Sequence, residues 1–316
     1  MHRTARSFPP AAMLWGVVAL TVAGASGCCG SLAEVMVSTP NRLNPFVTER
    51  NPLPPVERVA GVDQQFQVKV GPPEASLSVS VIEPEGGIEQ PKGTVLVLHG
   101  VHTRSFWMLR QAKDLATAGY RAVLVDLRGH GRSTGDYLTF GLREARDLSQ
   151  VIDALEQRGL VAGKIGVYGV SYGATTSIHL AGRDPRIRAV VAVAPFSTMR
   201  DEIPQYGRTM VPGVGRMISD ETYQQAIDEA GRRAGFDPDR ASAVEAIQRT
   251  SAQVLLIHGS NDWVVPQYHS IRLHEAARDH SELVSVPWYG HTVIWFDPTG
   301  EVAVRTAAWF DRWLGT

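Results

Sequence analysis

Gly169-Val170-Ser171-Tyr172-Gly173 places a serine between two glycines. A short apolar run, Lys164 to Tyr168, precedes this stretch, and a helix-like run of small and apolar residues, Ala174 to Ala181, follows it. This pattern is typical of a sharp turn from strand to helix, in which the positions two residues before and after the serine come too close together to carry side chains. We therefore predict that Ser171 occupies a nucleophile elbow.

Strand-like and helix-like runs alternate around this turn. The β-rich apolar runs are 94–98, 122–125, 165–168, 189–193, 254–257 and 283–286, and the amphipathic segments are 106–118, 143–157, 172–183, 268–278 and 301–314. Such alternation predicts a mainly parallel sheet with helices on both faces. Before it, 66–70 and 77–82 alternate apolar and polar residues around a Gly-Pro-Pro turn, as an antiparallel edge hairpin does.

Three residues with complementary chemistry follow strands of this predicted sheet. Ser171 comes after the third parallel run, Asp262 after the fifth and His291 after the sixth. The carboxyl ends of parallel strands meet at one edge, so these side chains are expected to converge there. A serine hydroxyl needs a base, which His291 would supply, and Asp262 would fix the tautomer of that imidazole. Activity should then rise with pH through roughly 6 to 7, the range in which an ordinary imidazole becomes neutral.

From about residue 66 to its end the chain resembles serine-dependent α/β-hydrolases, which use the same Ser, Asp, His order. Leu98-His99-Gly100 resembles the oxyanion loop of that family, and 126–133 resembles a loop of its lipase-like and aminopeptidase-like members. The sequences around Asp262, 258–266, and around His291, Gly290-His291, are also typical of that family. The resemblance implies an α/β-hydrolase fold with a small helical cap inserted before the acid-bearing strand. It also implies an oxyanion hole made by the backbone amides of Val101 and Tyr172.

Several of these residues have structural alternatives. Asp262 could instead cap the helix that follows it, in which case Asp297 or Asp201 would supply the carboxylate. The other histidines at strand ends are expected to make structural hydrogen bonds: His99, His130 and His258. His99 and His102 lie three residues apart, but no second cluster of ligands accompanies them, so a catalytic metal is not expected.

The segment 196–250 interrupts the alternation of strands and helices and is predicted to be the cap that sets substrate choice. Within it 204–207 and 211–215 are expected as loops, and 220–234 and 240–249 as helices. Met199, Tyr206, Met210 and Met217 would either form an apolar underside for an acyl chain or pack the cap onto the body. The full set of candidate pocket residues is His102, Trp107, Phe140, Met199, Tyr206 and Trp295.

The first 27 residues have the pattern of an export signal. Basic residues precede an apolar stretch, 11–25, which is short for a membrane span. Cys28 follows small residues as in a bacterial lipoprotein processing site, which makes lipid anchoring at Cys28 one expectation, beside ordinary cleavage and an uncleaved anchor. We expect 28–60 to be a Pro-rich spacer and 61–316 to be the catalytic domain, in the periplasm, on an envelope membrane or secreted.

Composition limits the remaining function classes. The net charge is −1 and no basic block is interleaved with aromatic residues, so nucleic-acid binding is not expected. The glycines at 129 and 131 are not followed by the Lys-Ser or Lys-Thr pair of a phosphate loop. No cofactor and no obligate protein partner are implied.

The sequence therefore predicts a monomer-capable, exported serine hydrolase that cleaves a small carboxylic ester through an acyl-enzyme. Two alternatives stay open. One is an amide or peptide hydrolase, because the resemblance extends to serine aminopeptidases and prolyl-oligopeptidase-like enzymes. The other is a hydrolase-fold envelope protein without activity.

Overall fold

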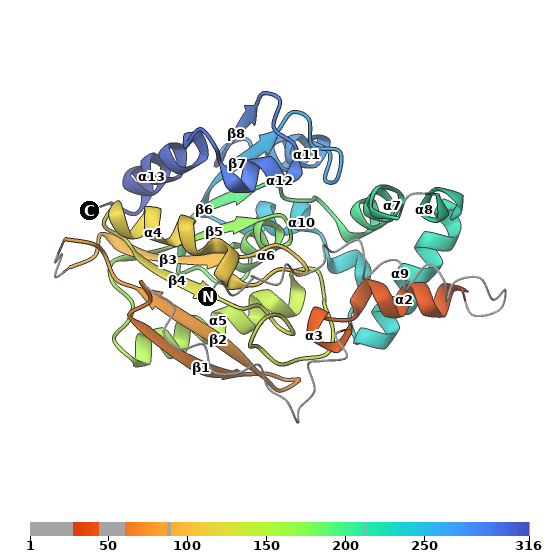
Figure 1. The fold of residues 1–316 in the computed structure, drawn as a ribbon, viewed down its shortest axis with the longest axis horizontal. Coiled ribbons are helices and arrows are strands. Elements are labelled where there is room, and N and C mark those ends of the chain that lie inside the picture. The colour runs from red at the N-terminus through yellow and green to blue at the C-terminus, as the bar shows by residue number, and fades with distance from the viewer. Residues whose placement is uncertain (1–27, 44–60, 87–89, 212, 316) are drawn as a thin grey trace, which may run out of the picture.

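The computed structural model describes residues 28–43, 61–86, 90–211 and 213–315, and its centre is one eight-stranded sheet (Figure 1). The strand order is β1-β2-β4-β3-β5-β6-β7-β8. A hairpin of β1 (Gln64–Val70) and β2 (Ala75–Ile82) joins the sheet antiparallel to β4. The remaining neighbours pair in parallel: β3 (Gly93–Leu98), β4 (Arg121–Val125), β5 (Lys164–Val170), β6 (Ile187–Val193), β7 (Gln253–Gly259) and β8 (Ser281–Val286). The predicted α/β-hydrolase fold class is confirmed, although only β1 of the hairpin is at the sheet edge.

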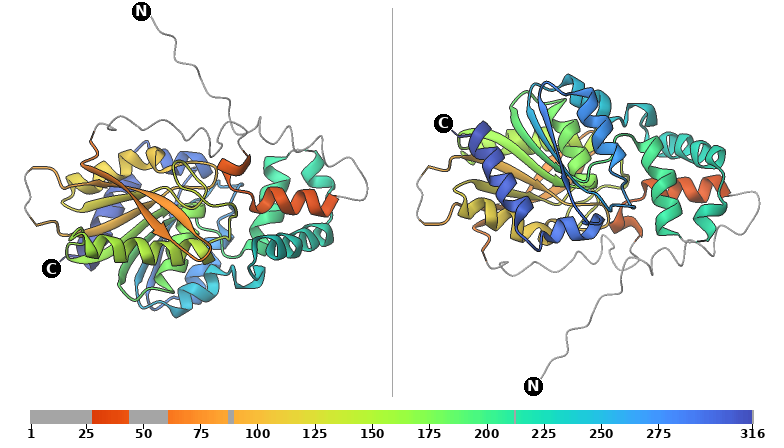
Figure 2. Two further views of the ribbon diagram at one scale, coloured as in Figure 1. Left: turned by 90° about the horizontal axis from the view of Figure 1, so that it is seen from below. Right: turned by 90° about the horizontal axis from the view of Figure 1, so that it is seen from above.

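Helices cover both faces of this sheet and create two apolar layers (Figures 1 and 2). On one face lie α4 (Leu109–Thr117) and α13 (Glu301–Trp313), and on the other α5 (Leu142–Gln157) and α6 (Tyr172–Ala181). Beside α6 packs α10 (Ala243–Arg249), which in turn contacts α11 (Tyr268–Ala276). Burial on both sides explains why the central strands read as continuous apolar runs. Two short helices belong to the body, η1 (Ser105–Met108) and α12 (His291–Phe296), and a third, η2 (Pro238–Arg240), precedes α10 and contacts the cap helices described below.

Three helices between β6 and α10 stand apart from the body: α7 (Met199–Met210), α8 (Val214–Met217) and α9 (Asp220–Ala234) (Figure 1). The expectation that 204–207 is a loop is wrong, because Pro204 lies inside α7. Thr198 caps this helix by accepting a hydrogen bond from the Asp201 amide, and Ile203 and Pro204 are buried. Capping and burial here outweigh the amide hydrogen bond that proline cannot make. The expected loop 211–215 contains the start of α8.

The expected spacer 28–60 also needs correction, because its first part is folded onto the cap. Helix α2 (Cys28–Val37) packs along α9, and α3 (Pro40–Leu43) follows it (Figure 2). Ala33 and Val37 are fully buried. The apolar residues of α2 outweigh the downstream prolines, and Pro40 stands at the first position of α3, where an amide hydrogen is not needed.

The predicted export signal, residues 1–27, and the remaining spacer residues, 44–60, lie outside the described residues. Within the part of the chain that the structure describes, no helix has both the length and the apolar character needed to cross a membrane.

Candidate active site

Ser171 lies in the tight turn between β5 and α6. Its φ of 51° and ψ of −115° are unusual for a residue with a side chain, and such strain is held by the structure around it. A Cβ added to Gly169 would lie 2.3 Å from the Gly173 carbonyl oxygen. A Cβ added to Gly173 would lie 2.6 Å from the carbonyl oxygens of Leu98 and His99. The steric reason for expecting two glycines around Ser171 is therefore present in the structure.

Ser171, His291 and Asp262 form one chain of hydrogen bonds, although 120 residues separate the first two. The Nε2 of His291 lies 3.1 Å from the Ser171 hydroxyl oxygen. The Nδ1 of His291 lies 2.7 Å from Oδ2 of Asp262 and donates to it. This leaves Nε2 as the acceptor that faces the serine hydroxyl. All three residues are buried, so the structure brings together the residues that the sequence pattern singled out.

Asp262 does not cap the following helix, which begins at Tyr268 after Gln267, but it holds the turn before that helix and also contacts His291. Its Oδ1 accepts hydrogen bonds from the amides of Val264 and Val265, at 3.0 and 2.9 Å, while its Oδ2 faces His291. Burial alone would raise the pKa of Asp262, but the hydrogen bonds from His258, His291 and the Val265 amide outweigh it and lower this pKa to about 2. The carboxylate is therefore charged and fixed in orientation near neutral pH.

The two substitute carboxylates are engaged elsewhere. Asp297 accepts hydrogen bonds from the amides of Val302 and Ala303 and so holds the start of α13. Asp201 accepts hydrogen bonds from the hydroxyl of Thr198 and the guanidinium of Arg272. Neither of them is hydrogen-bonded to His291 in the described residues.

The other histidines at the strand ends make structural contacts. The Leu127 amide donates to Nε2 of His99, whose Nδ1 donates to the Gly100 carbonyl. The Nε2 of His258 lies 2.8 Å from the Val265 carbonyl oxygen and 3.5 Å from Oδ2 of Asp262. His130 is fully buried and contacts its own loop through the Arg128 carbonyl. Among the described residues, no group of three His, Cys, Asp or Glu side chains is arranged to hold a metal ion.

Val101 and Tyr172 line the same pocket as Ser171: Val101 lies in the loop after β3, and Tyr172 directly follows the serine. Tyr172 is the first residue of α6, where helix amides have no acceptor within the helix. The loop that carries Val101 has one anchoring hydrogen bond and one unusual backbone conformation. Asp126 accepts the Ser105 amide at 2.7 Å, and His102 adopts a left-handed backbone with φ of 59°. The two residues predicted to supply oxyanion donors therefore lie beside the serine, Tyr172 at the start of α6 and Val101 in the loop after β3.

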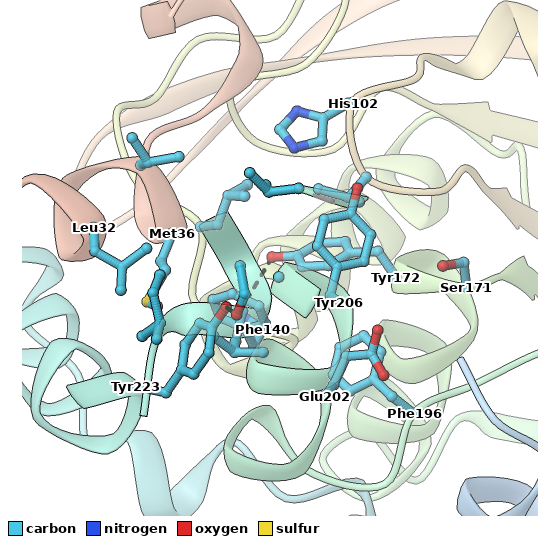
Figure 3. Close-up of a pocket in the computed structure, with 18 of the residues that line it drawn as sticks. Leu32, Met36, His102, Phe140, Ser171, Tyr172, Phe196, Glu202, Tyr206 and Tyr223 are labelled. Carbon is cyan, nitrogen blue, oxygen red and sulfur yellow. Dashed lines mark hydrogen bonds between the residues drawn. The ribbon is translucent and has the colours of Figure 1, made fainter. Parts of the chain in front are cut away.

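The pocket at Ser171 is apolar and has an empty volume of about 930 Å³, including open solvent at its mouth. Figure 3 shows Ser171 at one side and Leu32 and Met36 at the opposite side, with Tyr172 and Tyr206 between them. Helices α2, α7, α8 and α9 form most of its walls. Burial lowers the pKa of His102, at the pocket wall, to about 4.

Half of the predicted pocket residues line this cavity: His102, Phe140 and Tyr206. The predictions for the other three are wrong. Trp107 points to solvent with 61% of its surface exposed, because η1 turns its side chain outward. Met199 is fully buried in the core, and Trp295 packs on Gly100 and the ring of His291. Of the other methionines considered for the cap, Met217 is exposed.

The pocket also contains residues that sequence reasoning missed. Leu32, Val35 and Met36 come from α2, in the stretch that was expected to be a spacer. Glu202, on α7, is the acidic residue of the wall. No motif marks these positions; the apolar spacing within α2 was the one signal available for its three residues.

Glu202 is a buried carboxyl group, 5% exposed, in an otherwise apolar wall. Its Oε2 lies 3.3 Å from Nε2 of His269, whose Nδ1 accepts the Ser197 amide. Burial, together with the nearby charges of Asp262 and Asp201, raises the pKa of Glu202 well above its ordinary value. Burial lowers the pKa of His269 to about 4, so its imidazole is neutral at neutral pH, and the raised pKa of Glu202 favours the neutral form of the carboxyl group beside it.

Known proteins resemble the chain in both sequence and fold. A family model described as X-Pro dipeptidyl-peptidase (S15 family) matches residues 71–234, which are 164 of the 316 residues. YqkD of Bacillus subtilis (strain 168) is 27% identical over 187 residues, which cover 58% of this chain and 60% of that protein. Esterase YjfP of Escherichia coli (strain K12) is 24% identical over 225 residues, or 68% of this chain and 87% of that protein.

Among solved structures, the esterase Pf2001 of Pyrococcus furiosus is similar with a TM-score of 0.62 at 22% identity. The similarity covers 80% of this chain and 93% of that one, and it supports the fold. Because the family model covers more than half of the sequence, the chain belongs to the family described as X-Pro dipeptidyl-peptidase (S15 family), and its fold is that of the α/β-hydrolases.

Proposed function

We propose that the protein hydrolyses carboxylic esters through an acyl-enzyme on Ser171. The observation that carries this proposal is the chain of hydrogen bonds from Ser171 through His291 to Asp262, at one end of an apolar pocket. A hydroxyl with a base in hydrogen-bond reach, and a base oriented by a third group, are the requirements of nucleophilic catalysis.

In the proposed reaction the Oγ of Ser171 attacks the ester carbonyl carbon while its proton passes to Nε2 of His291. The tetrahedral intermediate then expels the alcohol, which takes that proton, and the acyl group remains on Ser171. Water attacks the acyl-enzyme with His291 again accepting the proton, and the acid leaves as Ser171 is restored. Asp262 keeps the Nδ1 proton of His291 in place and stabilises the imidazolium in both steps.

The negative oxygen of each tetrahedral intermediate is assigned to the backbone amides of Val101 and Tyr172. Amide donors in rigid turns need no reorganisation when charge develops on the oxygen, which is the basis of their effect on rate. The strained backbone of Ser171 and of His102 supports this role, since strain of this kind collects where a site is preorganised.

An ester with an aliphatic acyl group fits the pocket best, because its walls are mainly aliphatic and aromatic. Cleavage of amide or peptide bonds is the second candidate. The description of the matched family as X-Pro dipeptidyl-peptidase favours it.

The experiment compares turnover of p-nitrophenyl esters with turnover of Gly-Pro and single-residue p-nitroanilides, using the wild-type protein and Ser171→Ala. Turnover of the esters that is lost in Ser171→Ala supports the proposal. Turnover of the anilides alone would make the protein a peptidase. Inactivity on both classes would leave a hydrolase-fold protein without this chemistry.

The proposal includes export to the cell envelope, with a lipid on Cys28 as the attachment. Its support is the sequence pattern of residues 1–28 and their position before the folded part of the chain.

A further inference from the structure

Helix α2 contributes one apolar face to the pocket. Leu32, Val35 and Met36 line the cavity, and their spacing of three and four residues puts them on the same side of the helix. Leu32 and Met36 are each only 8% exposed. In Figure 3 these two side chains lie across the cavity from Ser171. Helix α2 therefore walls the end of the pocket that is distant from the nucleophile.

This wall is held in place at two points of the helix, in its middle and at its C-terminal end. Glu34 forms ion pairs with Arg233 of α9 at 3.0 Å and with Arg42 at 2.8 Å. The Leu138 amide donates to the Val37 carbonyl at 2.7 Å, which ties the end of α2 to the body.

The segment after α2 is attached to the loop that follows β4. The Thr39 hydroxyl donates to the Gly135 carbonyl, and the Asn41 amide side chain donates to the carbonyls of Gly131 and Ser133. A Cβ on Gly129 would lie 2.2 Å from the side chain of Thr39, which shows how closely the two segments meet. Helix α2 is thus a fixed part of the pocket rather than a loose covering.

The distal end presents little polarity to a ligand. Leu138, Val214, Ile218 and Tyr223 also line the pocket, and the hydroxyl of Tyr223 donates to the Gly215 carbonyl. Glu34, the charged residue of α2, is bonded to arginines outside the pocket lining. An apolar end opposite a nucleophile suits the methyl end of an aliphatic chain.

From this arrangement we infer that α2 is the specificity wall of the enzyme: Leu32 and Met36 set the length of the aliphatic acyl chain that the pocket accepts. The inference rests on the proposed function, because it assumes that the acyl group is the part of the substrate that enters this cavity. An acyl chain bound to Ser171 runs between Tyr172 and Tyr206 and ends against Leu32 and Met36.

The test measures kcat/KM for p-nitrophenyl acetate, butyrate, octanoate and laurate with the full chain and two variants of Met36. Met36→Trp fills the distal end and should lower the octanoate-to-acetate ratio of kcat/KM by about tenfold or more, since one or two methylenes are worth that much in an apolar pocket. Met36→Ala opens the end and should shift the preferred chain length upward. Met217→Trp is the matched control, because Met217 is 85% exposed and does not line the pocket.

A second measurement separates this inference from the proposed function. Calorimetry of decanoate binding to Ser171→Ala needs no turnover, and adding Met36→Trp should weaken that binding about tenfold, whereas adding Met217→Trp should not. Circular dichroism melts check that each variant is folded. The inference is overturned if Met36→Trp, Met36→Ala and wild type have the same chain-length ratios and the same affinity for decanoate. If no ester is turned over but decanoate still binds, and binds more weakly in Met36→Trp, the proposed function alone is overturned.

Discussion

Asp262 makes two kinds of hydrogen bond at this site. Asp262 uses one carboxylate oxygen to fix the turn at Val264 and Val265 and the other to hold His291. Sequence reasoning treated a helix cap and a catalytic carboxylate as competing interpretations. The structure shows that Asp262 caps no helix, since α11 begins after Gln267, but that its turn hydrogen bonds coexist with the bond to His291. A carboxylate has enough lone pairs for three donors.

Asp262→Asn should reduce kcat on the order of 10⁴-fold, because an amide no longer fixes the tautomer of His291 or stabilises its charged form. The measurement is kcat for a p-nitrophenyl ester at neutral pH. Asp201→Asn is the matched control, since Asp201 is bonded to Thr198 and Arg272 rather than to His291. Equal activity of Asp262→Asn and Asp201→Asn would contradict the role given to Asp262.

Glu202→Gln should stabilise the protein increasingly as pH rises. The pKa of Glu202 is raised in the folded state, so the stability that the neutral carboxyl group contributes is fully present below the unfolded value of about 4.5. That stability is lost as pH rises through the folded pKa. Glutamine has the same shape and does not ionise.

The measurement is the melting temperature of wild type and Glu202→Gln at about pH 5 and about pH 8. The difference in favour of the variant should be larger at the higher pH. The same replacement at the exposed Glu221 serves as the control. A difference that shrinks with pH would show that the sign assigned to Glu202 is wrong.

The helices and strands whose sequences show a regular hydrophobic period could be predicted. All eight strands and the five long helices of the body were expected within a few residues, because burial on one or both faces imposes periodicity. The short α12 was not expected, since six residues are too few for a helical period to be recognised. Helix α2 was assigned to a spacer because its main packing partner is α9, almost two hundred residues away.

The residues of the site also fall into a predictable group and an unpredictable one. Ser171, Asp262 and His291 stand in local motifs at strand ends, so their convergence could be foreseen. The pocket walls depend on how cap, body and α2 pack together, which no local pattern encodes. Trp107, Met199 and Trp295 were therefore placed in the pocket wrongly, while Leu32, Met36 and Glu202 were overlooked.

Gly173→Ala should lower the free energy of unfolding by about 1–3 kcal/mol, because its Cβ would collide with the backbone of Leu98 and His99. It should also reduce activity by about 10²-fold, since Ser171 would be displaced. Gly159→Ala is the control for a left-handed glycine in open space and should cost about 1 kcal/mol with activity intact. Urea unfolding and ester turnover measure both effects. A Gly173→Ala protein with the stability and turnover of Gly159→Ala would contradict the steric account of the elbow.

At the scale of the whole molecule, the chain folds back so that its first described helix, α2, lines the pocket that contains Ser171. Helix α2 begins at Cys28, the residue proposed to carry a lipid. A lipid there would attach the membrane to the same helix that walls the acyl end of the pocket.

Cys28→Ala in the full chain should abolish incorporation of labelled palmitate and move the protein from the detergent phase to the aqueous phase. Cys29→Ala should leave both unchanged, because only the first residue after processing is lipidated in the proposed scheme. The measurement is palmitate labelling of each variant in a bacterial host, followed by detergent-phase partitioning of the extract. Membrane association and labelling that survive Cys28→Ala would rule out this mode of attachment.

The central claim is that Ser171 is the nucleophile of the enzyme. The most direct measurement is reaction of the wild-type chain with a fluorophosphonate, followed by mass spectrometry of the peptide that carries the adduct. The account predicts one adduct, on Ser171, which is absent from Ser171→Ala although that variant is folded. An adduct on another residue, or labelling that persists in Ser171→Ala, would contradict it.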